Sequence, residues 1–491
     1  MTIPLRGSLV AGLTALAALG AAPALAATCD EIAGLAIEGG TITGTEMVTG
    51  GTYTIAGGQG PVEHTDLPDF CRVSLTMAPS EASAIAVEVW LPAAESWNGR
   101  YLAMGNGGFA GSIGASGMIA PLRAGYVTSS TDTGHTVTDG SFGLDEDLLL
   151  DFAYRAVHEM ARASKETIAA FYEAEAEQAY FSGCSTGGRQ ALTAALRYPD
   201  DFDGIIAGAA AISGARLHAS QTWEGRVGHR EDGALPSADD LVTLNQAALA
   251  QCDALDGVAD NVIENPLTCT VDVAAAGFSG PVADTLQSLY NGPMTAAGDP
   301  IFPGLAPGSE AGWGQMLGPD PLFVAVDFYR YFVYGDASWS PETFDPEAAV
   351  ADAAAVADII GSESSDLSAF FANDGKLLLY HGWADPGISP YNSIDYYEAA
   401  LANSGPEAAD NMRLFMVPGM GHCGGGEGPT SFDSLAALDA WVSEGTAPQS
   451  IIASRIRDGE VDRTRPLCPY PQTAVYNGTG DTDDAASFIC Q

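Results

Sequence analysis

The chain has 491 residues, of which 63 are Asp or Glu and 19 are Lys or Arg, and its formal net charge is −44. This charge excludes a general affinity for nucleic acid or for anionic membranes, because both need basic patches. A hydrophobic content of 46% excludes wholesale disorder, and the length suits one large domain with an insertion, or two to three domains. The acidic surface indicates ordinary solvation or adaptation to high salt, and nothing in the sequence indicates an oligomeric state.

The first 26 residues have the organisation of a secretory signal. Arg6 supplies positive charge, residues 9–21 are apolar, and an Ala-Leu-Ala sequence ending at Ala26 forms a small-x-small cleavage site. The alternative, a membrane anchor, is disfavoured because the apolar stretch is short for a span. We therefore predict cleavage near Ala26 and an exported protein, secreted or periplasmic.

Strands and helices alternate along most of the chain. Apolar, β-branched or alternating runs predict strands, and apolar residues at helical spacing predict helices. The predicted strands are 84–91, 101–104, 125–130, 179–182, 205–211, 376–380 and 412–417, and the predicted helices are 152–171 and 187–196. Such alternation is typical of an α/β fold with a mainly parallel sheet.

Residues 214–365 interrupt this alternation. They are rich in Asp, Ala, Gly, Pro and aromatic residues, and they follow one predicted core strand and precede another. We predict an inserted lid domain here, with the core formed by residues 27–213 and 366–491.

Eight cysteines follow the predicted signal, and an even number indicates four disulfides in an oxidising compartment. Counting alone leaves about 105 pairings open. Zinc binding is the alternative, but the chain has no Cys-x-x-Cys pair. The cysteines are Cys29, Cys71, Cys184, Cys252, Cys269, Cys423, Cys468 and Cys490.

A glycine-flanked serine, Ser185, lies between a predicted strand and a predicted helix. The surrounding Gly-Cys-Ser-Thr-Gly sequence matches the G-x-S-x-G pattern, in which small residues let a serine hydroxyl stand exposed on a sharp strand-to-helix turn. The pattern alone is weak, and a serine on an ordinary tight turn is the alternative. Its placement between strand and helix favours a hydrolase nucleophile.

A nucleophilic serine needs a histidine base and an acid that orients it. Asp385 follows strand 376–380, and His422 follows strand 412–417, so both lie where ligands collect in α/β sheets. The resulting order of Ser185, Asp385 and His422 is that of the α/β-hydrolases. His381 is the nearest competing histidine, but it ends a strand and precedes the acid.

Cysteines adjoin the predicted nucleophile and base. Cys184 precedes Ser185 and Cys423 follows His422. If serine and histidine converge, a disulfide between these cysteines becomes feasible, and it would join the two loops. Two unrelated structural cysteines are the alternative.

The oxyanion formed during acyl transfer needs two backbone N–H groups. Thr186, the residue after the nucleophile, supplies one in this fold. The glycine-rich loop that begins at Gly105 follows an early strand, and we predict Gly108 as the second donor, with Gly107 next. A plain flexible turn is the alternative for this loop.

The sequence Cys-Asp-Ala-Leu-Asp-Gly-Val-Ala-Asp, residues 252–260, places three carboxylates around a glycine turn. Such a loop suits a hard cation, and Ca²⁺ suits it better than Mg²⁺ because Ca²⁺ tolerates flexible geometry. On so acidic a chain, three neighbouring aspartates without a metal are an equal alternative.

Taken together, these motifs resemble the tannase/feruloyl esterase family of α/β-hydrolases over nearly the whole mature chain. The family hallmark is Cys-Ser, Asp and His-Cys with the two cysteines bonded, here Cys184-Ser185, Asp385 and His422-Cys423. Further matching segments are 97–100, 105–108, 130–135, 183–189, 203–208, 381–385 and 421–423. The resemblance implies an α/β-hydrolase core with a lid and a serine esterase.

The resemblance also implies a structural Ca²⁺ in the lid. Its implied ligands are Asp253, Asp256 and Asp260 with the main-chain carbonyls of Val258 and Val262. The implied disulfides are Cys184–Cys423, Cys252–Cys269, Cys29–Cys71 and Cys468–Cys490.

The implied substrates are esters of flat aromatic acids. The family divides among feruloyl or other hydroxycinnamoyl esters, galloyl esters and mono(2-hydroxyethyl) terephthalate, and we favour the feruloyl type because the negative field slows anionic substrates at low salt. Candidate substrate contacts in the lid are Arg330, Phe332 and Trp339. The alternatives for these residues are lid core and a surface ion pair. A non-catalytic, calcium-dependent binding protein on this scaffold is a remote alternative, which an intact triad disfavours.

Overall fold

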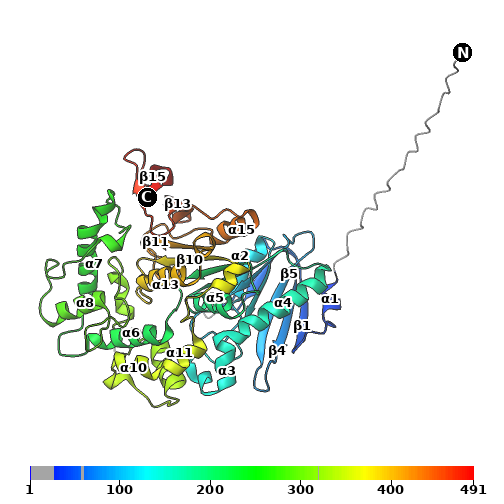
Figure 1. Cartoon of the computed structure of the whole chain (residues 1–491), viewed down its shortest axis with the longest axis horizontal. Coiled ribbons are helices and arrows are strands. Elements are labelled where there is room, and N and C mark those ends of the chain that lie inside the picture. The colour runs from blue at the N-terminus through cyan, green and yellow to red at the C-terminus, as the bar shows by residue number, and fades with distance from the viewer. Residues whose placement is uncertain (2–26, 57–59, 319) are drawn as a thin grey trace.

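A nine-stranded sheet forms the centre of the molecule (Figure 1). The computed structural model describes residues 1, 27–56, 60–318 and 320–491, so the signal predicted for residues 1–26 lies, beyond Met1, outside the described residues. In spatial order the strands are β1 (Gly40–Val48), β4 (Phe70–Met77), β5 (Ile85–Pro92), β7 (Val127–Thr131), β6 (Arg100–Met104), β8 (Gln178–Cys184), β9 (Gly204–Gly208), β10 (Lys376–Gly382) and β11 (Met412–Val417).

Five of the eight strand pairings, from β7 through β6, β8, β9 and β10 to β11, are parallel, and the three from β1 to β7 are antiparallel. Every residue of β7 and of β9 is buried, as expected for strands covered on both faces. The predicted α/β class with a mainly parallel sheet is confirmed. Strands β1 and β4 extend the sheet beyond the predicted elements.

Helices cover both faces of this sheet (Figure 1). On one face lie α4 (Ala156–Tyr172), α5 (Thr186–Arg197) and α13 (Pro390–Asn403), and on the other α2 (Ala115–Arg123) and α15 (Ser434–Glu444). Neighbouring side chains of β8 alternate between them, since Phe181 packs with the first set and Tyr180 with the second. A five-residue π-helix, Asp151–Arg155, precedes α4 and overlaps the start of the predicted helix 152–171.

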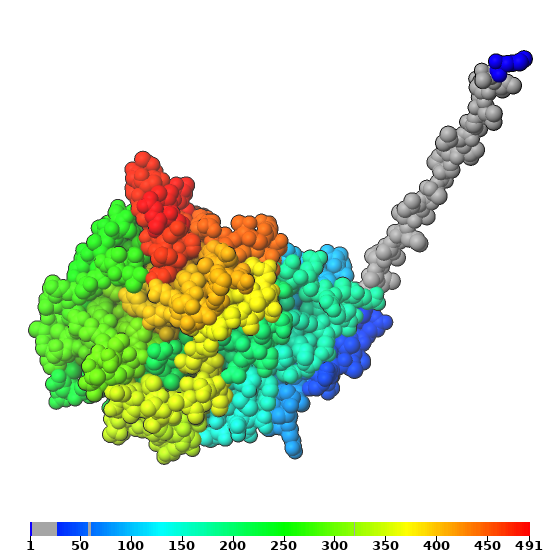
Figure 2. Space-filling view, in the orientation of Figure 1, coloured from blue at the N-terminus to red at the C-terminus, as the bar shows by residue number. Residues whose placement is uncertain are grey.

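The chain between β9 and β10 adds no strand to the central sheet among its described residues, and we call residues 214–365 the lid segment. Two apolar clusters hold it in place: one around Leu244 and Trp313 lies within the segment, and one around Phe328 and Tyr329 joins it to core residues such as Phe152. Figures 1 and 2 show it, in green to yellow, on the side of the molecule away from β1 and β4. The helices here are α6 (Gly214–Val227), α7 (Ala238–Cys252), α8 (Pro281–Asn291), α9 (Phe323–Asp327), α10 (Pro346–Asp352) and α11 (Ala354–Ile360), followed by α12 (Ser368–Ala372).

The remaining elements are short. They are α1 (Cys29–Ile32), α3 (Glu146–Leu150), α14 (Ala408–Asn411) and the hairpins β2 (Tyr53–Ile55)–β3 (Val62–His64), β12 (Ile451–Arg457)–β13 (Glu460–Leu467) and β14 (Ala474–Tyr476)–β15 (Phe488–Cys490). None of the helices in the described part of the chain is both long and apolar enough to cross a membrane.

Four disulfides join Cys29 to Cys71, Cys184 to Cys423, Cys252 to Cys269, and Cys468 to Cys490. These are the pairs that the family resemblance implies, and they leave no free cysteine. Four disulfides are consistent with an oxidising, extracellular environment.

Candidate active site

Ser185 lies on a strained turn between β8 and α5. Its φ is +62°, a left-handed value that a serine rarely adopts. Glycines make the turn possible, because a Cβ on Gly183 would lie 2.5 Å from the main chain of Gly187, and one on Gly187 would lie 2.9 Å from the carbonyl oxygen of Asn106. The backbone is thus held in a conformation that lifts the serine out of both the strand and the helix.

Asp385 and His422 follow the carboxyl ends of the neighbouring parallel strands β10 and β11. Their side chains meet, with His422 Nδ1 2.7 Å from Asp385 Oδ2. Asp385 is fully buried, and its other oxygen, Oδ1, accepts hydrogen bonds from the main-chain N–H groups of Gly387 and Ile388. The carboxylate is therefore fixed in place by its own loop and points one oxygen at the histidine ring.

A second histidine shares the same oxygen of Asp385. Buried His381 places Nε2 3.1 Å from Asp385 Oδ2 and 3.1 Å from the carbonyl oxygen of Ile388, while Nδ1 lies 2.7 Å from Ser393 Oγ. Since Nε2 faces two acceptors, it carries the proton, and Nδ1 accepts from the serine hydroxyl. His381, predicted as the weaker candidate base, thus holds the acid in place.

The charge on this pair is set by its surroundings. Burial acts to raise the pKa of Asp385, but the hydrogen bonds from His381 and His422 outweigh it, and the pKa lies below its ordinary range. Burial acts to lower the pKa of His422, but the bond to Asp385 outweighs it, and the pKa is raised above 6.5. Asp385 therefore stays ionised, and its negative charge stabilises the protonated form of His422. A histidine that is to accept a proton from a serine needs such a partner.

The disulfide Cys184–Cys423 joins the residue before Ser185 to the residue after His422, with Cα atoms 5.9 Å apart. It holds the serine turn and the histidine loop together across 239 residues of sequence. No hydrogen bond between Ser185 Oγ and His422 is formed among the described residues, as in many sites where such bonds tighten only around substrate.

The predicted oxyanion donors lie beside the serine. Thr186 begins α5, and its hydroxyl donates to the carbonyl oxygen of Gly108 at 2.8 Å. Gly108 has a φ of +54°, which suits glycine, and the loop before it is tied to α5 because the main-chain N–H of Asn106 donates to Gln190 Oε1. The glycine loop is therefore a fixed part of the site.

Two cavities meet at Ser185, His422 and Gly108. The first, which we call the apolar cavity, has a volume of about 250 Å³ and runs beneath the lid segment, with aromatic walls from Phe109, Phe152, Phe328 and Phe332. The second, of about 510 Å³, is lined by the glycine loop, the end of β8 and Cys423. The serine side chain is therefore open to a cavity on each of two sides.

The three lid residues predicted to contact substrate are placed differently. Phe332 lines the apolar cavity, whereas Arg330 and Trp339 are not among its lining residues. Arg330 forms an ion pair with Asp327 at 2.7 Å and donates to the carbonyl oxygen of Trp339 at 3.2 Å. The guanidinium group is thus turned toward Asp327 and the main chain at Trp339.

The lining also includes four polar residues that the sequence analysis did not select, Arg189, His218, Gln221 and Gln315. Arg189 is buried and donates to the carbonyl oxygens of Phe152, Ala153 and Ile360. The Gly-Gly-Arg sequence after Ser185 was the available signal for Arg189, while no local motif marks His218 or Gln221.

The acidic loop after α7 is closed by Cys252–Cys269. Asp253 accepts hydrogen bonds from the main-chain N–H groups of Asp260 and Asn261, and Asp256 accepts one from Val258. Burial and neighbouring carboxylates raise the pKa of Asp256 to about 6.

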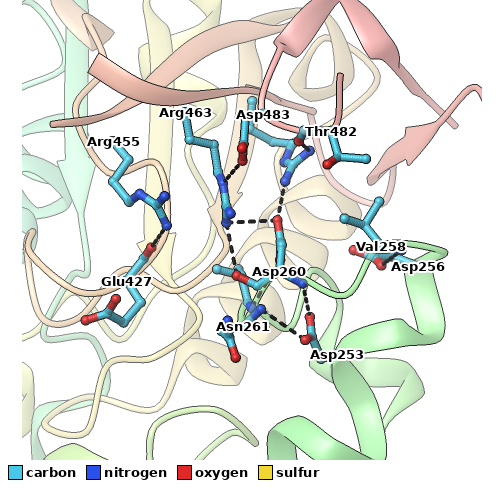
Figure 3. A network of polar contacts seen from close by, with 12 residues as sticks. Asp253, Asp256, Val258, Asp260, Asn261, Glu427, Arg455, Arg463, Thr482 and Asp483 are labelled. Atoms are coloured by element: carbon cyan, nitrogen blue, oxygen red, sulfur yellow. Dashed lines mark hydrogen bonds and ion pairs between the residues drawn. The ribbon is translucent and has the colours of Figure 1, made fainter. Parts of the chain in front are cut away.

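Two arginines of β13 reach this loop. Asp260 pairs with Arg463 at 2.9 Å and with Arg465 at 2.5 Å, as Figure 3 shows for the contact with Arg463. Within the described residues no three His, Cys, Asp or Glu side chains gather closely enough to hold a metal ion. By type, however, the donors fit a hard cation, because one disulfide-closed loop supplies three carboxylates together with main-chain carbonyls.

Comparison with known proteins places this arrangement among esterases. The family described as tannase and feruloyl esterase matches residues 71–298 and 324–491. An uncharacterized esterase of Xanthomonas campestris is 35% identical, covering 97% of this chain and 93% of its own length. Feruloyl esterase C of Talaromyces stipitatus is 32% identical, covering 94% of each chain.

The fold also resembles those of solved structures. Feruloyl esterase B from Aspergillus oryzae superposes with a TM-score of 0.86 at 29% identity, over 94% of this chain and 99% of its own. Tannin acyl hydrolase from Aspergillus niger superposes with a TM-score of 0.78 over 95% of each chain, and at 22% identity that likeness concerns the fold alone.

Proposed function

Since the chain belongs to the tannase and feruloyl esterase family and is a carboxylic ester hydrolase, we propose that its substrates are esters of hydroxycinnamic acids of the feruloyl type. The observation that carries this proposal is the apolar cavity beside Ser185, whose walls are the rings of Phe109, Phe152, Phe328 and Phe332. A flat aromatic acyl group suits such walls, because stacked and edge-on rings attract one another beyond simple burial.

We assign the reaction to a triad of Ser185, His422 and Asp385. His422 Nε2 accepts the proton of the serine hydroxyl as Oγ attacks the ester carbonyl carbon, and Asp385 orients the ring through Nδ1. The negative charge on the carbonyl oxygen is stabilised by the main-chain N–H groups of Thr186 and Gly108. The alcohol then leaves with the proton from His422, and a water molecule activated by the same nitrogen hydrolyses the acyl-enzyme.

The two cavities divide the substrate. The aromatic acyl group enters the apolar cavity under the lid segment, and the alcohol lies toward the glycine loop and Cys423. Arg330, engaged by Asp327, offers no cation to a free carboxylate, and this favours feruloyl esters over mono(2-hydroxyethyl) terephthalate.

We also propose that Asp253, Asp256 and Asp260, with the carbonyls of Val258 and Val262, hold a structural Ca²⁺ in the lid segment. The ion would supply positive charge to a loop that carries three carboxylates, and it takes no part in ester hydrolysis. The four disulfides support export, with cleavage of the signal near Ala26.

Initial rates on methyl ferulate, methyl gallate and mono(2-hydroxyethyl) terephthalate test the proposal, with Ser185→Ala as the control. We expect kcat/KM for methyl ferulate to exceed the others by about tenfold or more, because a pocket shaped to one acyl group discriminates at least to that degree. We expect Ser185→Ala to lose about 10⁶-fold in kcat. A preference for the gallate or the terephthalate would replace the substrate assignment, and an active Ser185→Ala protein would refute the triad.

A further inference from the structure

One of the polar side chains that line the apolar cavity has a ring nitrogen that the steps of ester hydrolysis do not use. His218, on α6, lines the cavity, and its ring packs against Phe328 with centroids 4.5 Å apart. Its Nδ1 lies 2.9 Å from Oε1 of Gln221, one helical turn further on. Among the described residues its other ring nitrogen, Nε2, has no hydrogen-bond partner.

The proton on this ring is fixed by a chain of hydrogen bonds that ends at the catalytic acid. Gln221 Nε2 donates to the carbonyl oxygen of Gly387 at 2.9 Å, and the N–H of Gly387 donates to Asp385 Oδ1. A carbonyl oxygen only accepts, so the amide nitrogen of Gln221 must face Gly387 and its oxygen must face His218. Nδ1 of His218 therefore carries the proton, and Nε2 is a hydrogen-bond acceptor.

The environment keeps this ring neutral. Burial lowers the pKa of His218 to about 4, and the positive charge of Arg189 acts in the same direction against the hydrogen bond to Gln221. Arg189 itself is engaged by main-chain carbonyls. At neutral pH the cavity thus presents a single-proton imidazole whose free nitrogen can only accept.

We propose that His218 Nε2 accepts a hydrogen bond from a hydroxyl group on the ring of the bound acyl group, and that this contact makes the enzyme selective for phenolic acids. The inference rests on the proposed function, since it takes the apolar cavity as the acyl site. A phenol supplies the O–H donor that the nitrogen lacks. A methyl ether or an unsubstituted ring supplies none, and a carboxylate brings only lone pairs toward the lone pair of Nε2.

Three matched esters test the proposal: methyl 4-hydroxycinnamate, methyl 4-methoxycinnamate and methyl cinnamate. For the wild-type protein we expect kcat/KM on the hydroxylated ester to exceed that on each of the other two by about tenfold, the typical contribution of one neutral hydrogen bond in a desolvated site. In His218→Phe the ratio of kcat/KM on the hydroxylated ester to that on each of the other two esters should fall to about one. His218→Gln, whose amide oxygen can reach the place of Nε2, should restore part of the preference.

Phe328→Leu is the matched control, because it alters the same wall without changing the acceptor, and it should lower the rates on all three esters alike. A wild-type protein that hydrolyses the three esters equally overturns the proposal and leaves the proposed function standing. The same holds for a preference that persists in His218→Phe. Absence of turnover on all three esters by the wild-type protein refutes the proposed function and the inference with it.

Discussion

The core and the lid segment contribute to the site in different ways. At the carboxyl edge of the sheet the backbone holds the three triad residues. Ser185 lies on a left-handed turn between closely packed glycines, and Asp385 Oδ1 accepts two main-chain N–H groups. The Cys184–Cys423 disulfide joins the serine turn to the loop of His422. The lid segment contributes side chains that pack on one another, chiefly the rings around Phe328. The reacting groups therefore depend on backbone geometry, whereas the walls of the apolar cavity depend on side-chain packing, which is more readily altered by substitution.

The largest effect in the core is expected from Asp385→Asn, which tests whether Asp385 orients His422. The amide keeps the shape but presents an N–H group that competes with the His422 Nδ1–H, so the ring is held in the wrong tautomer. We expect kcat to fall about 10⁴-fold. The measurement is steady-state hydrolysis of methyl ferulate, with circular dichroism to verify that the fold is kept. A loss below about tenfold would mean that Asp385 does not orient the base.

The pH profile sharpens the same point. His422 acts as a base only when neutral, and its pKa is raised above 6.5, so kcat/KM should be high above that pKa and fall as the pH drops through it. In a variant without the carboxylate, such as Asp385→Asn, the cause of the raised pKa is gone. The acid limb of the residual activity should then move to lower pH. An unchanged limb would assign it to another group.

Removing the Cys184–Cys423 disulfide tests how far the core depends on a covalent link. We expect Cys184→Ala with Cys423→Ala to lower the free energy of unfolding by about 2–5 kcal/mol and kcat by about 100-fold, because the serine and histidine loops become free to separate. The matched control is Cys468→Ala with Cys490→Ala, a pair outside both cavities. This control should lose stability but keep kcat. Equal losses of kcat in the two double variants would contradict a specific role for the link.

Calcium removal tests the lid side. If the acidic loop holds Ca²⁺, chelation should lower Tm by several degrees and Ca²⁺ should restore it, as expected for a ligand that binds only the folded state. Asp256→Asn should reduce the response to Ca²⁺, and isothermal titration calorimetry measures the binding directly. A Tm unaffected by chelator, together with no heat of binding, would show that the loop holds no Ca²⁺ and that Arg463 and Arg465 alone offset its negative charge.

The smallest effect is expected from Arg330→Gln. The Arg330 side chain, which pairs with Asp327, is partly exposed, so its loss should change the free energy of unfolding by less than about 1 kcal/mol. We expect kcat/KM on methyl ferulate and on mono(2-hydroxyethyl) terephthalate to stay within about twofold of wild type. A selective loss on the terephthalate ester would instead make Arg330 a substrate contact.

Local signals made much of the core predictable. Ser185 is marked by the glycines on either side, and Asp385 and His422 by the buried strands that precede them, so short stretches of sequence sufficed. Strand β4 could have been predicted, because its buried and half-buried residues alternate along Phe70–Met77 as in a half-buried strand. Its partner β1 was missed because its exposed and half-buried side chains make no clear alternation.

Side-chain direction and distant partners were beyond the sequence. Arg330 lies in a run of aromatic residues typical of a ligand-binding surface, yet its guanidinium group forms an ion pair with Asp327, three residues earlier. His218 has no local motif, and what makes it an acceptor is the hydrogen bond from Gln221 to Gly387, 166 residues further on. The ion pairs of Asp260 with Arg463 and Arg465 likewise join segments about 200 residues apart.

The disulfide between Cys184 and Cys423 has a topological consequence. It closes a covalent ring of chain that contains the whole lid segment as well as β10 and Asp385. A protease that cuts once within the lid segment opens this ring without separating its ends, so the nicked molecule remains a single covalent unit with the serine turn still bonded to the histidine loop. Only a cut combined with a reductant breaks every covalent connection between the two pieces, which then stay together through the pairing of β9 with β10 and the packing around it.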